Sequence, residues 1–341
     1  MSDLFEKLLI LRTPRIGPAK YNALIRKFGD VRAAAASLRS DDAHRDAVLR
    51  EMDRAAVLGI KYVADTDADY PAALRRITNH PPVISVRGNL AALRQPTVAM
   101  VGTRHSTAAG MMFMGNLARE FASRGFTVAS GLAMGTDAAA HRGALAAPGD
   151  AQTVAVVAGG VDYIWPIENE SLYHEIVARG AVISEMPVGF VPVASNFIMR
   201  NRWVAGIADR LILGEADLKS GSMATARFAR EYGRDVWAIP SHPSDSRAAG
   251  PNSMIASGDA HLCGGVSDFF RTDKKKAPEK EKMEKDNDAT DSLLDKLGTV
   301  PMSETVLTQI VKKDISEIKR ELVVLELRGL VRKTDGGYVR V

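Results

Sequence analysis

Between residues 96 and 270, two patterns of hydrophobic and polar positions alternate along the chain. Short runs of consecutive apolar residues are separated by longer stretches in which apolar residues recur every three or four positions. A continuous apolar run is typical of a parallel strand buried on both faces, and the longer period is typical of a helix. The predicted strands are TVAMVG (97–102), FTVASG (126–131), TVAVVAGG (153–160), AVISEM (181–186), RLILGEA (210–216) and DVWAIP (235–240).

This alternation of strand and helix predicts the fold class. Strands that alternate with helices along the chain form a parallel sheet with helices on both faces. We therefore predict an α/β fold whose central domain, residues 96–270, is a Rossmann-like, doubly wound, mostly parallel sheet.

The pattern in residues 1–95 is helical. Leu4, Leu8 and Leu11 fall on one helical face, and a second amphipathic stretch begins at Gly17-Pro18, where glycine ends one helix and proline starts the next. The segment is net basic. It fits a SAM-like or helix-hairpin-helix-like domain, whose glycine turn offers backbone N–H groups to a phosphate. It fits a plain helical bundle equally well.

Residues 271–291 contain almost no apolar side chains and many charges of both signs. Burial cannot offset the entropy of ordering such a segment, so we predict a charged flexible linker. Residues 292–341 then show three helical stretches, followed by a strand pair with a turn at Asp335-Gly336-Gly337. Three helices and a hairpin predict a winged-helix domain.

Composition narrows the class of protein. A chain of 341 residues with 46% hydrophobic residues is globular and holds two or three domains. The net charge of +4 and the isoelectric point of about 9.1 permit an anionic partner without requiring one. The single cysteine, Cys263, gives no disulfide framework and fits the cytoplasm. No signal peptide and no membrane span are predicted.

Candidate chemistry lies where the predicted strands end, because ligands of doubly wound sheets bind outside the carboxyl ends of the strands. Glycines there let a ligand approach the backbone, cationic side chains attract an anion, and a helix start adds its dipole. The predicted site residues are Gly102, Thr103, Arg104, Gly131, Gly135, Arg200, Asn201, Arg202, Lys219, Ser220, Gly221 and Ser222.

The first of these turns departs from a dinucleotide site. A G-x-G-x-x-G fingerprint requires a second glycine, but Gly102 is followed by Thr103 and Arg104. An arginine there holds phosphates away from the turn. We therefore expect a chain of several phosphates that crosses the end of the sheet.

The two arginines of Arg200-Asn201-Arg202 point about 200° apart on a helix. Only one is expected to face the ligand, and the other is expected to bind a carboxylate such as Glu215 or Asp209.

Nearby residues have competing interpretations. Asp137 and His141 share a helix face and are compatible with an acid/base pair, although a histidine held by an aspartate one turn earlier is more often structural. Phe197 and Trp203 are compatible with base stacking or with the core. No catalytic residue, metal site or cofactor is predicted: the histidines show no ligand-type pairing, and no G-x-x-x-x-G-K-[ST] motif occurs.

As a set, the motifs resemble the DNA-processing protein A (DprA/Smf) family. The matching pieces lie in family order over residues 96–262: VGTR, SGLAMGTDAAAHRGAL, AVVAGGVDYIWPIEN, GAVISEMP, RNR and KSGSMATARFAREYGRDVWAIP. The family's small N-terminal helical domain and its frequent C-terminal winged helix fit the flanking segments.

The resemblance implies a DNA-binding protein rather than an enzyme. It implies single-stranded DNA binding without marked sequence preference, in a basic pocket at this sheet edge. The matching binding residues are Arg104, Arg200 to Arg202 and Lys219 to Ser222. It also implies a homodimer that protects incoming DNA in natural transformation and helps to load the RecA recombinase.

The chain departs from the family pattern in one loop. Pro240-Ser241 stands where the family usually has Pro-Gly, and Gly250-Pro251-Asn252 stands where it usually has Gly-Thr-Asn. Because Pro251 lacks a backbone N–H, a phosphate site that uses this loop is expected to be altered.

Two other functions compete with this prediction. One is a nucleotide-binding hydrolase of the phosphoribohydrolase (lysine decarboxylase-like) type, but its P-G-G-x-G-T-x-x-E signature is absent, and Glu185 and Glu215 lack a glycine cradle. The other is a sequence-specific regulator that reads DNA with the winged helix. The third helix of that domain mixes Lys319 and Arg320 with Glu317, which argues against major-groove recognition and leaves DNA or protein contact equally open.

Overall fold

The computed structural model describes residues 3–38, 41–149, 152–271, 293–298, 300–327, 329–334 and 336–340. The chain forms two compact units, Met1–Lys276 and Ala277–Val341. Of the predicted linker, 271–291, only the backbone of Arg271 is described, as the last residue of a helix, and the rest lies outside the described residues. No described helix is long and apolar enough to cross a membrane.

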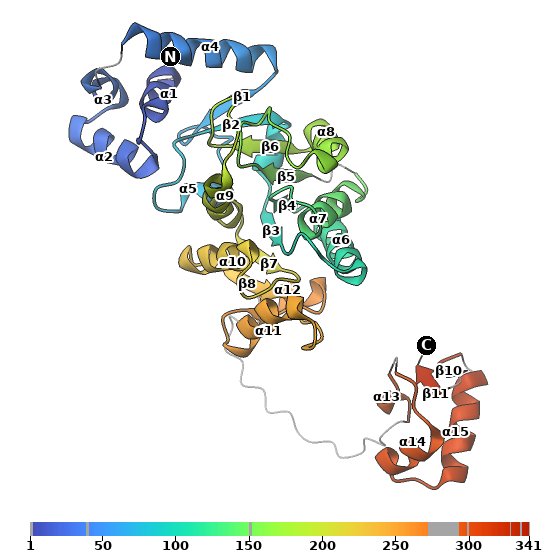
Figure 1. Cartoon of the computed structure of the whole chain (residues 1–341). Helices are drawn as coiled ribbons and strands as arrows, with labels where there is room; N and C mark the ends of the chain where they lie inside the picture. The colour runs from blue at the N-terminus through green and yellow to red at the C-terminus, as the bar shows by residue number, and fades with distance from the viewer. Residues whose placement is uncertain are drawn as a thin grey trace. The chain divides into compact units, whose positions relative to one another are not determined.

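The first unit is built on a nine-stranded sheet with the order β1-β2-β6-β5-β4-β3-β7-β8-β9 (Figure 1). Pairing is parallel from β6 to β9, and β1 and β2 add an antiparallel edge. The strands are β1 (Lys61–Ala64), β2 (Val83–Gly88), β3 (Thr97–Val101), β4 (Thr127–Ser130), β5 (Thr153–Val156), β6 (Ala181–Ser184), β7 (Arg210–Leu213), β8 (Asp235–Ala238) and β9 (His261–Leu262).

The predicted doubly wound, mostly parallel sheet is confirmed, and the predicted strands appear as β3 to β8. The expectation of a helical domain over residues 1–95 is wrong in its second half, because β1 and β2 belong to the sheet. β1 has only four residues and is followed by turns and the one-turn helix α5 (Ala72–Arg75), so no extended apolar run marks it in the sequence. β9, with two exposed residues, was missed for the same reason.

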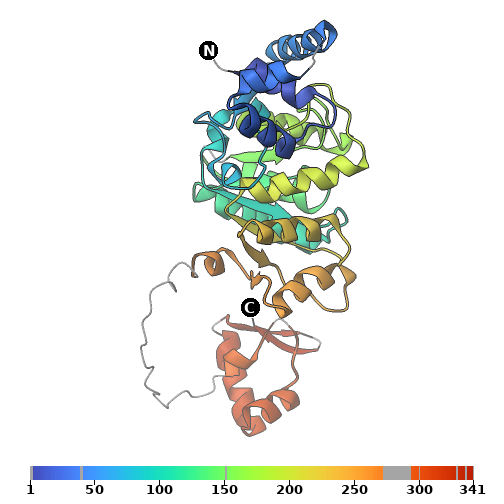
Figure 2. The same ribbon diagram turned by 90° about the vertical axis from the view of Figure 1, so that its left-hand side faces the viewer.

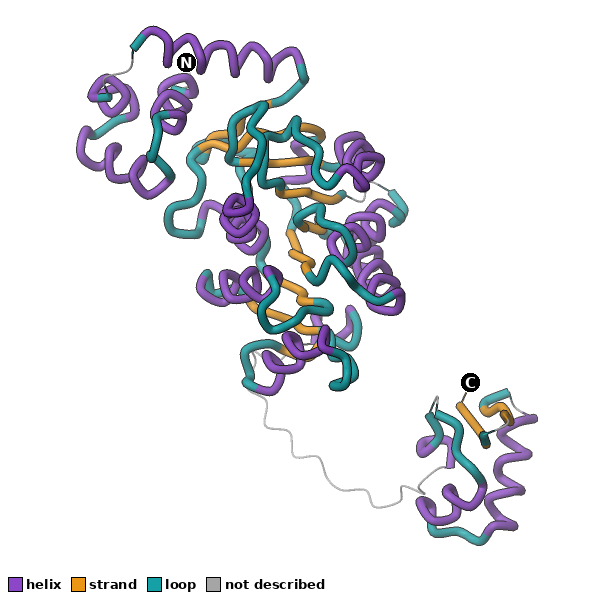
Figure 3. The backbone as a smooth tube through the Cα atoms, in the orientation of Figure 1, coloured by secondary structure: helices purple, strands orange, loops and turns teal. Residues whose placement is uncertain are grey.

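Helices cover both faces of the sheet (Figures 1 and 3). On one face, α5 packs with α9 (Ala194–Ile207), α10 (Gly221–Glu231) and α11 (Ala249–Ala256). The other face carries α6 (Ala108–Ser123), α7 (Thr136–Leu145), α8 (Glu170–Arg179) and α12 (Val266–Arg271). Short 3₁₀ helices span Leu90–Leu93 (η1), Ile167–Asn169 (η2) and Ser246–Ala248 (η3). Each sheet face is therefore buried, as the continuous apolar strands require.

Four helices form the N-terminal part of the unit: α1 (Leu4–Arg12), α2 (Pro18–Phe28), α3 (Val31–Ser37) and α4 (Asp42–Val57). Pro18 starts α2, and the carboxylates of Asp30 and Asp41 accept N–H groups at the starts of α3 and α4. Their shared core includes Leu8 and extends to Ala64 of β1 and residues beside it, so these helices pack on the β1–β2 end of the sheet (Figure 2).

Helices α6 and α7 approach each other closely where Gly143 faces Gly115. A Cβ on Gly143 would lie 2.1 Å from the carbonyl oxygen of Gly115. We expect Gly143→Ala to lower the free energy of unfolding by about 1–3 kcal/mol, because the helices must move apart, as measured by urea denaturation. Gly265→Ala is the control, because a Cβ there meets nothing within 4 Å. Equal stability of the two variants would show that the helix crossing has room to spare.

The second unit consists of α13 (Leu293–Lys296), α14 (Glu304–Val311), α15 (Ile315–Leu327), β10 (Val331–Thr334) and β11 (Gly337–Arg340). Three helices and an antiparallel hairpin form the predicted winged helix. Asp335, in the predicted turn, lies outside the described residues. On the third helix, α15, Lys319 pairs with Glu304 and Glu321 pairs with Lys313. Carboxylates therefore already bind two of the lysines on or beside this helix.

Candidate functional site

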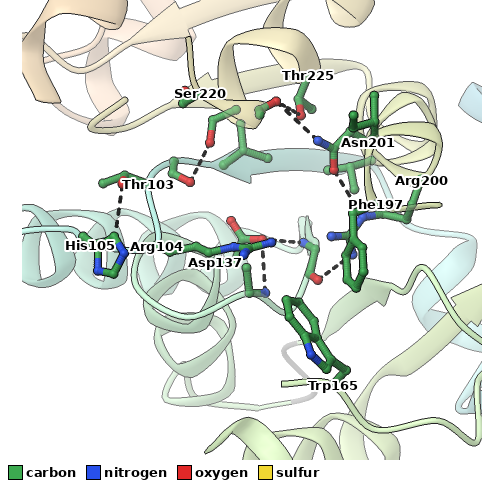
Figure 4. A pocket seen from close by; sticks show the side chains of 18 of the residues that line it. Thr103, Arg104, His105, Asp137, Trp165, Phe197, Arg200, Asn201, Ser220 and Thr225 are labelled. Atoms are coloured by element: carbon green, nitrogen blue, oxygen red, sulfur yellow. Dashed lines mark hydrogen bonds between the residues drawn. The ribbon is translucent and has the colours of Figure 1, made fainter. Parts of the chain in front are cut away.

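Segments from both sheet faces meet at the carboxyl ends of the central strands and enclose a cavity of about 540 Å³ (Figure 4). They are the turns after β3, β4 and β5, the helix α9, and the start of α10. Strands β3 and β7 are neighbours here, although the strand that follows β3 in sequence, β4, pairs on its other side. The cavity therefore lies at the switch point of the sheet, where doubly wound folds bind ligands.

The turn after β3 presents Arg104 to the cavity. Arg104 is exposed, its guanidinium lies 5.1 Å from the ring centre of Trp165, and within the described residues it has no carboxylate partner. Figure 4 shows its side chain extending into the cavity. Gly135, with φ of +72°, supports the turn, because a Cβ there would lie 2.5 Å from the carbonyl oxygens of Thr103 and Arg104. Arg104 is thus a cation free to bind an anion.

The cavity floor contains a buried arginine and a buried aspartate. Arg200 is 7% exposed and donates to the carbonyl oxygens of Gly131, at 2.5 Å, and Val156. Asp137 accepts the N–H groups of Gly131 and Ala133, at 3.1 and 3.3 Å. A Cβ on Gly131 would lie 2.8 Å from both side chains, so only glycine leaves them room. Arg200 therefore ties the ends of β4 and β5 together beneath the cavity.

Burial shifts the pKa values of both groups. It lowers the pKa of Arg200 to about 10, opposed by the negative charge of Asp137. It raises the pKa of Asp137, opposed by the positive charge of Arg200 and by the backbone N–H groups. Arg200 stays charged at neutral pH. Because its guanidinium is buried, solvent screens its positive potential in the cavity only weakly.

The start of α10 forms the opposite wall. Ser220 accepts the N–H of Met223 through its hydroxyl, and the Ser222 hydroxyl donates to the carbonyl oxygen of Gly102 at 2.6 Å. The Asn201 amide donates to the carbonyl oxygen of Gly221 at 3.3 Å and so joins α9 to α10. The N-terminal end of this 11-residue helix adds partial positive charge to the cavity.

An aromatic wall completes the cavity. The rings of Trp165 and Phe197 lie 4.4 Å apart at 57°, and both side chains are half-buried. Trp203, the other aromatic residue considered for stacking, is 3% exposed and belongs to the core. Sequence reasoning missed Trp165; the signal available was a tryptophan in the turn after a predicted strand, where few apolar side chains are expected.

Comparisons with known proteins agree with this architecture. Residues 61–273 match the family described as DNA recombination-mediator protein A. Residues 2–53 match the DprA-like N-terminal HHH domain, and residues 276–337 match the DprA winged helix domain. The chain belongs to the DNA processing protein A family. The N-terminal match also favours the helix-hairpin-helix interpretation over a plain bundle.

Individual relatives support the assignment to the DNA processing protein A family. Protein Smf of Escherichia coli (strain K12) is 32% identical over 283 residues, covering 80% of this chain and 75% of the relative. Protein Smf of Synechocystis is 38% identical over 202 residues, and the match spans 58% of this chain but only 50% of that relative. A solved structure of DNA processing protein A from Helicobacter pylori has a TM-score of 0.57 at 30% identity, covering 64% of this chain and 98% of that one.

Of the predicted site residues, Gly135, Arg202 and Lys219 do not line the cavity. Gly135 supports the Arg104 turn from behind. Lys219 is exposed on the turn before α10, where its backbone N–H bonds Asp217. Arg202 points away, with a nitrogen 3.7 Å from Glu185 and its guanidinium 3.9 Å from the Trp203 ring centre. The two arginines of the family's R-N-R motif are thus divided, because residues two positions apart point to opposite sides of α9.

One of the two arginines was predicted to bind a carboxylate, and Arg202 does so, but neither predicted partner is correct. Glu215 accepts hydrogen bonds from Ser106 and Thr107, and Asp209 pairs with Arg76. Burial raises the pKa of Glu185, against the opposing charge of Arg202. Neither Glu185 nor Glu215, the candidate hydrolase carboxylates, lines the cavity.

Asp137 and His141 do not form an acid/base pair. The Nδ1 atom of His141 lies 2.7 Å from the Thr153 hydroxyl, while Asp137 bonds backbone N–H groups. Burial lowers the pKa of His141 to about 3, so it is neutral at physiological pH. Its role is structural.

The loop that departs from the family pattern lies outside the cavity lining. Its two unusual segments contact each other: the Asn252 amide accepts the N–H of Ser241 at 3.2 Å and donates to its carbonyl oxygen at 2.8 Å. Pro251 lies in the first turn of α11, where a backbone N–H has no partner within the helix. The missing N–H therefore costs α11 no hydrogen bond of its own, and it is not among the groups that line the cavity.

Proposed function

We propose that this protein binds single-stranded DNA, without sequence preference, in the cavity at the switch point. The observation that carries the proposal is the placement of Arg104, without a carboxylate partner, beside the wall of Trp165 and Phe197. Arg104 and the start of α10 supply contacts for backbone phosphates, and the rings supply a face on which a base can stack. Bases in a duplex are already stacked on each other, so this arrangement favours a single strand.

The family assignment extends the proposal to a biological role. The Helicobacter pylori relative has been described for its single-stranded DNA binding mode. We infer that this chain acts without catalysing a reaction, protects incoming DNA in natural transformation, and loads the RecA recombinase as a cytoplasmic homodimer. Any ATP hydrolysis then belongs to the recombinase.

A fluorescence-anisotropy titration tests the binding proposal. Labelled poly(dT) and a duplex of equal length are titrated with the full chain over a series of salt concentrations. We expect tighter binding of the single strand and a log–log salt slope that reports several neutralised phosphates. Equal affinity for the duplex, or no affinity for either, would contradict the proposal. A screen of mononucleotides for binding and hydrolysis would then test the phosphoribohydrolase alternative.

The aromatic wall makes a separate prediction. Trp165→Ala is expected to weaken poly(dT) binding by about 1 kcal/mol, because a base loses its stacking surface. The salt slope should stay unchanged, since no phosphate contact is removed. The same titration measures both quantities. A weaker salt slope in this variant would instead indicate that Trp165 acts by positioning Arg104.

A further inference from the structure

We propose that helix α4 of the N-terminal helical part holds the DNA cavity in its binding shape, through a brace formed by Glu51, Arg54 and Asp162. Glu51 and Arg54 lie on α4, and Asp162 lies on the turn after β5. The brace holds the backbone N–H groups of Val188 and Gly189, in the loop that leads into α9. None of the three side chains lines the cavity. The proposal concerns positioning residues and rests on the proposed function.

The first contact of the brace passes through Asp162, whose side chain is only 7% exposed. One carboxylate oxygen of Asp162 accepts the N–H of Gly189 at 2.7 Å, and the other accepts from Arg54 at 2.8 Å. Gly189 has φ of +82°, and a Cβ there would lie 3.3 Å from an Arg54 nitrogen, so the guanidinium lies close against this backbone. Arg54 thus fixes the Asp162 carboxylate and, through it, the backbone N–H of Gly189.

The second contact passes through Glu51. One of its oxygens accepts the N–H of Val188 at 3.3 Å and the Tyr62 hydroxyl at 2.8 Å. Arg12 of α1 binds both oxygens at 2.7 Å, and the Arg12 and Glu51 side chains are only 12% and 9% exposed. An arginine–carboxylate pair that is joined by two hydrogen bonds and largely shielded from water has a well-fixed geometry. The loop is therefore attached to α1 and α4 as well as to the sheet.

The braced loop is bonded to the two segments that carry the aromatic wall. The carbonyl oxygen of Phe190 accepts the N–H of Gly160, which lies in the same turn as Asp162 and Trp165. The N–H of Val193 is capped by the Asn196 amide oxygen at 2.8 Å, and Phe197 follows within the first turn of α9. A loop released from α4 would therefore let Phe197 move relative to Trp165. Pre-organisation of this kind raises affinity without adding a contact to the ligand.

Arg54→Ala tests the brace, because the Arg54 side chain is 59% exposed and its removal leaves the core intact. In the full-length protein we expect faster hydrogen exchange across 186–197, and poly(dT) affinity reduced by about threefold to tenfold. The salt slope should stay that of the wild type, because no phosphate contact is lost. Arg54→Lys should recover part of the affinity. Arg32→Ala is the matched control: Arg32 also pairs with an aspartate in the N-terminal part but lies away from the loop, so it should change neither quantity.

The outcomes separate the brace from the binding proposal. Unchanged exchange and unchanged affinity in Arg54→Ala would overturn the brace. A salt slope lowered by about 0.7 would also overturn it, because Arg54 would then be a phosphate contact. If the wild type binds no poly(dT), the proposed function fails. The hydrogen-exchange measurement then tests the brace by itself. If exchange across 186–197 is no faster in Arg54→Ala than in the wild type, the brace is overturned as well.

Discussion

Replacing Arg104 by alanine is expected to weaken poly(dT) binding about tenfold to a hundredfold and to lower the log–log salt slope by about 0.7. A hydrogen bond to a charged group contributes about 1.5–3 kcal/mol, and Arg104 has no carboxylate among the described residues to offset that loss. The free energy of unfolding should stay close to that of the wild type, because Arg104 is exposed. Salt-dependent anisotropy and urea denaturation measure the two effects.

Two further variants make the Arg104 result specific. Arg104→Lys keeps the charge and should keep most of the salt slope. It loses the guanidinium that can bind one phosphate through two N–H groups and that lies over the Trp165 ring. Arg124→Ala removes the same charge from the far end of α6, where Arg124 pairs with Glu120, and should leave binding unchanged. If Arg124→Ala weakened binding as much as Arg104→Ala, net charge would explain the affinity and the cavity would not.

The central sheet could be predicted because each buried strand is a continuous apolar run, such as Thr97–Val101, that is flanked by a helical period. The edge strands β1 and β9 could not, and the interior strand β2 (Val83–Gly88) was not predicted either. Lys61–Ala64 has one face against the N-terminal helices and the other partly exposed, so its pattern is neither continuous nor clearly alternating. Strand identity at an edge depends on the neighbour that supplies the hydrogen bonds, and for Lys61–Ala64 that neighbour is Val83–Gly88, which follows only after turns and the helix α5.

The site was predicted through residue type at strand ends, which located Arg104 and the turn at Ser220 correctly within the cavity. Helix geometry predicted that only one of Arg200 and Arg202 faces the cavity, but it did not predict which one or the carboxylate that binds the other. Arg202 binds Glu185 on the other side of α9. Trp165 joins the site through its contacts with Phe197 and Arg104, which come from other segments. Such pairings are set by helix packing, which local sequence patterns do not encode.

Arg200→Met is expected to lower the free energy of unfolding by about 3–5 kcal/mol, the largest stability effect that we expect of any substitution in the cavity. The variant leaves Asp137 buried beside Gly131 without a positive charge, and it frees the carbonyl oxygens of Gly131 and Val156. Urea denaturation measures the loss. Asp137→Asn in the same background should recover part of it, because a neutral amide oxygen can still accept the N–H groups of Gly131 and Ala133.

The pH dependence identifies the cause of that loss. Burial already raises the pKa of Asp137 in the folded wild type, and removal of Arg200 takes away the charge that opposes the rise. A carboxyl whose pKa is higher in the folded than in the unfolded state contributes stability while it is protonated. This stability is lost as pH rises above the pKa of the unfolded state, about 4. The Arg200→Met penalty should therefore be smaller at pH 5 than at pH 8, and Asp137→Asn should remove this difference. Arg200→Met could instead keep wild-type stability and lower the log–log salt slope of poly(dT) binding by the amount of one phosphate contact. Arg200 would then be a DNA ligand like Arg104, and the cavity floor would have to open when DNA binds.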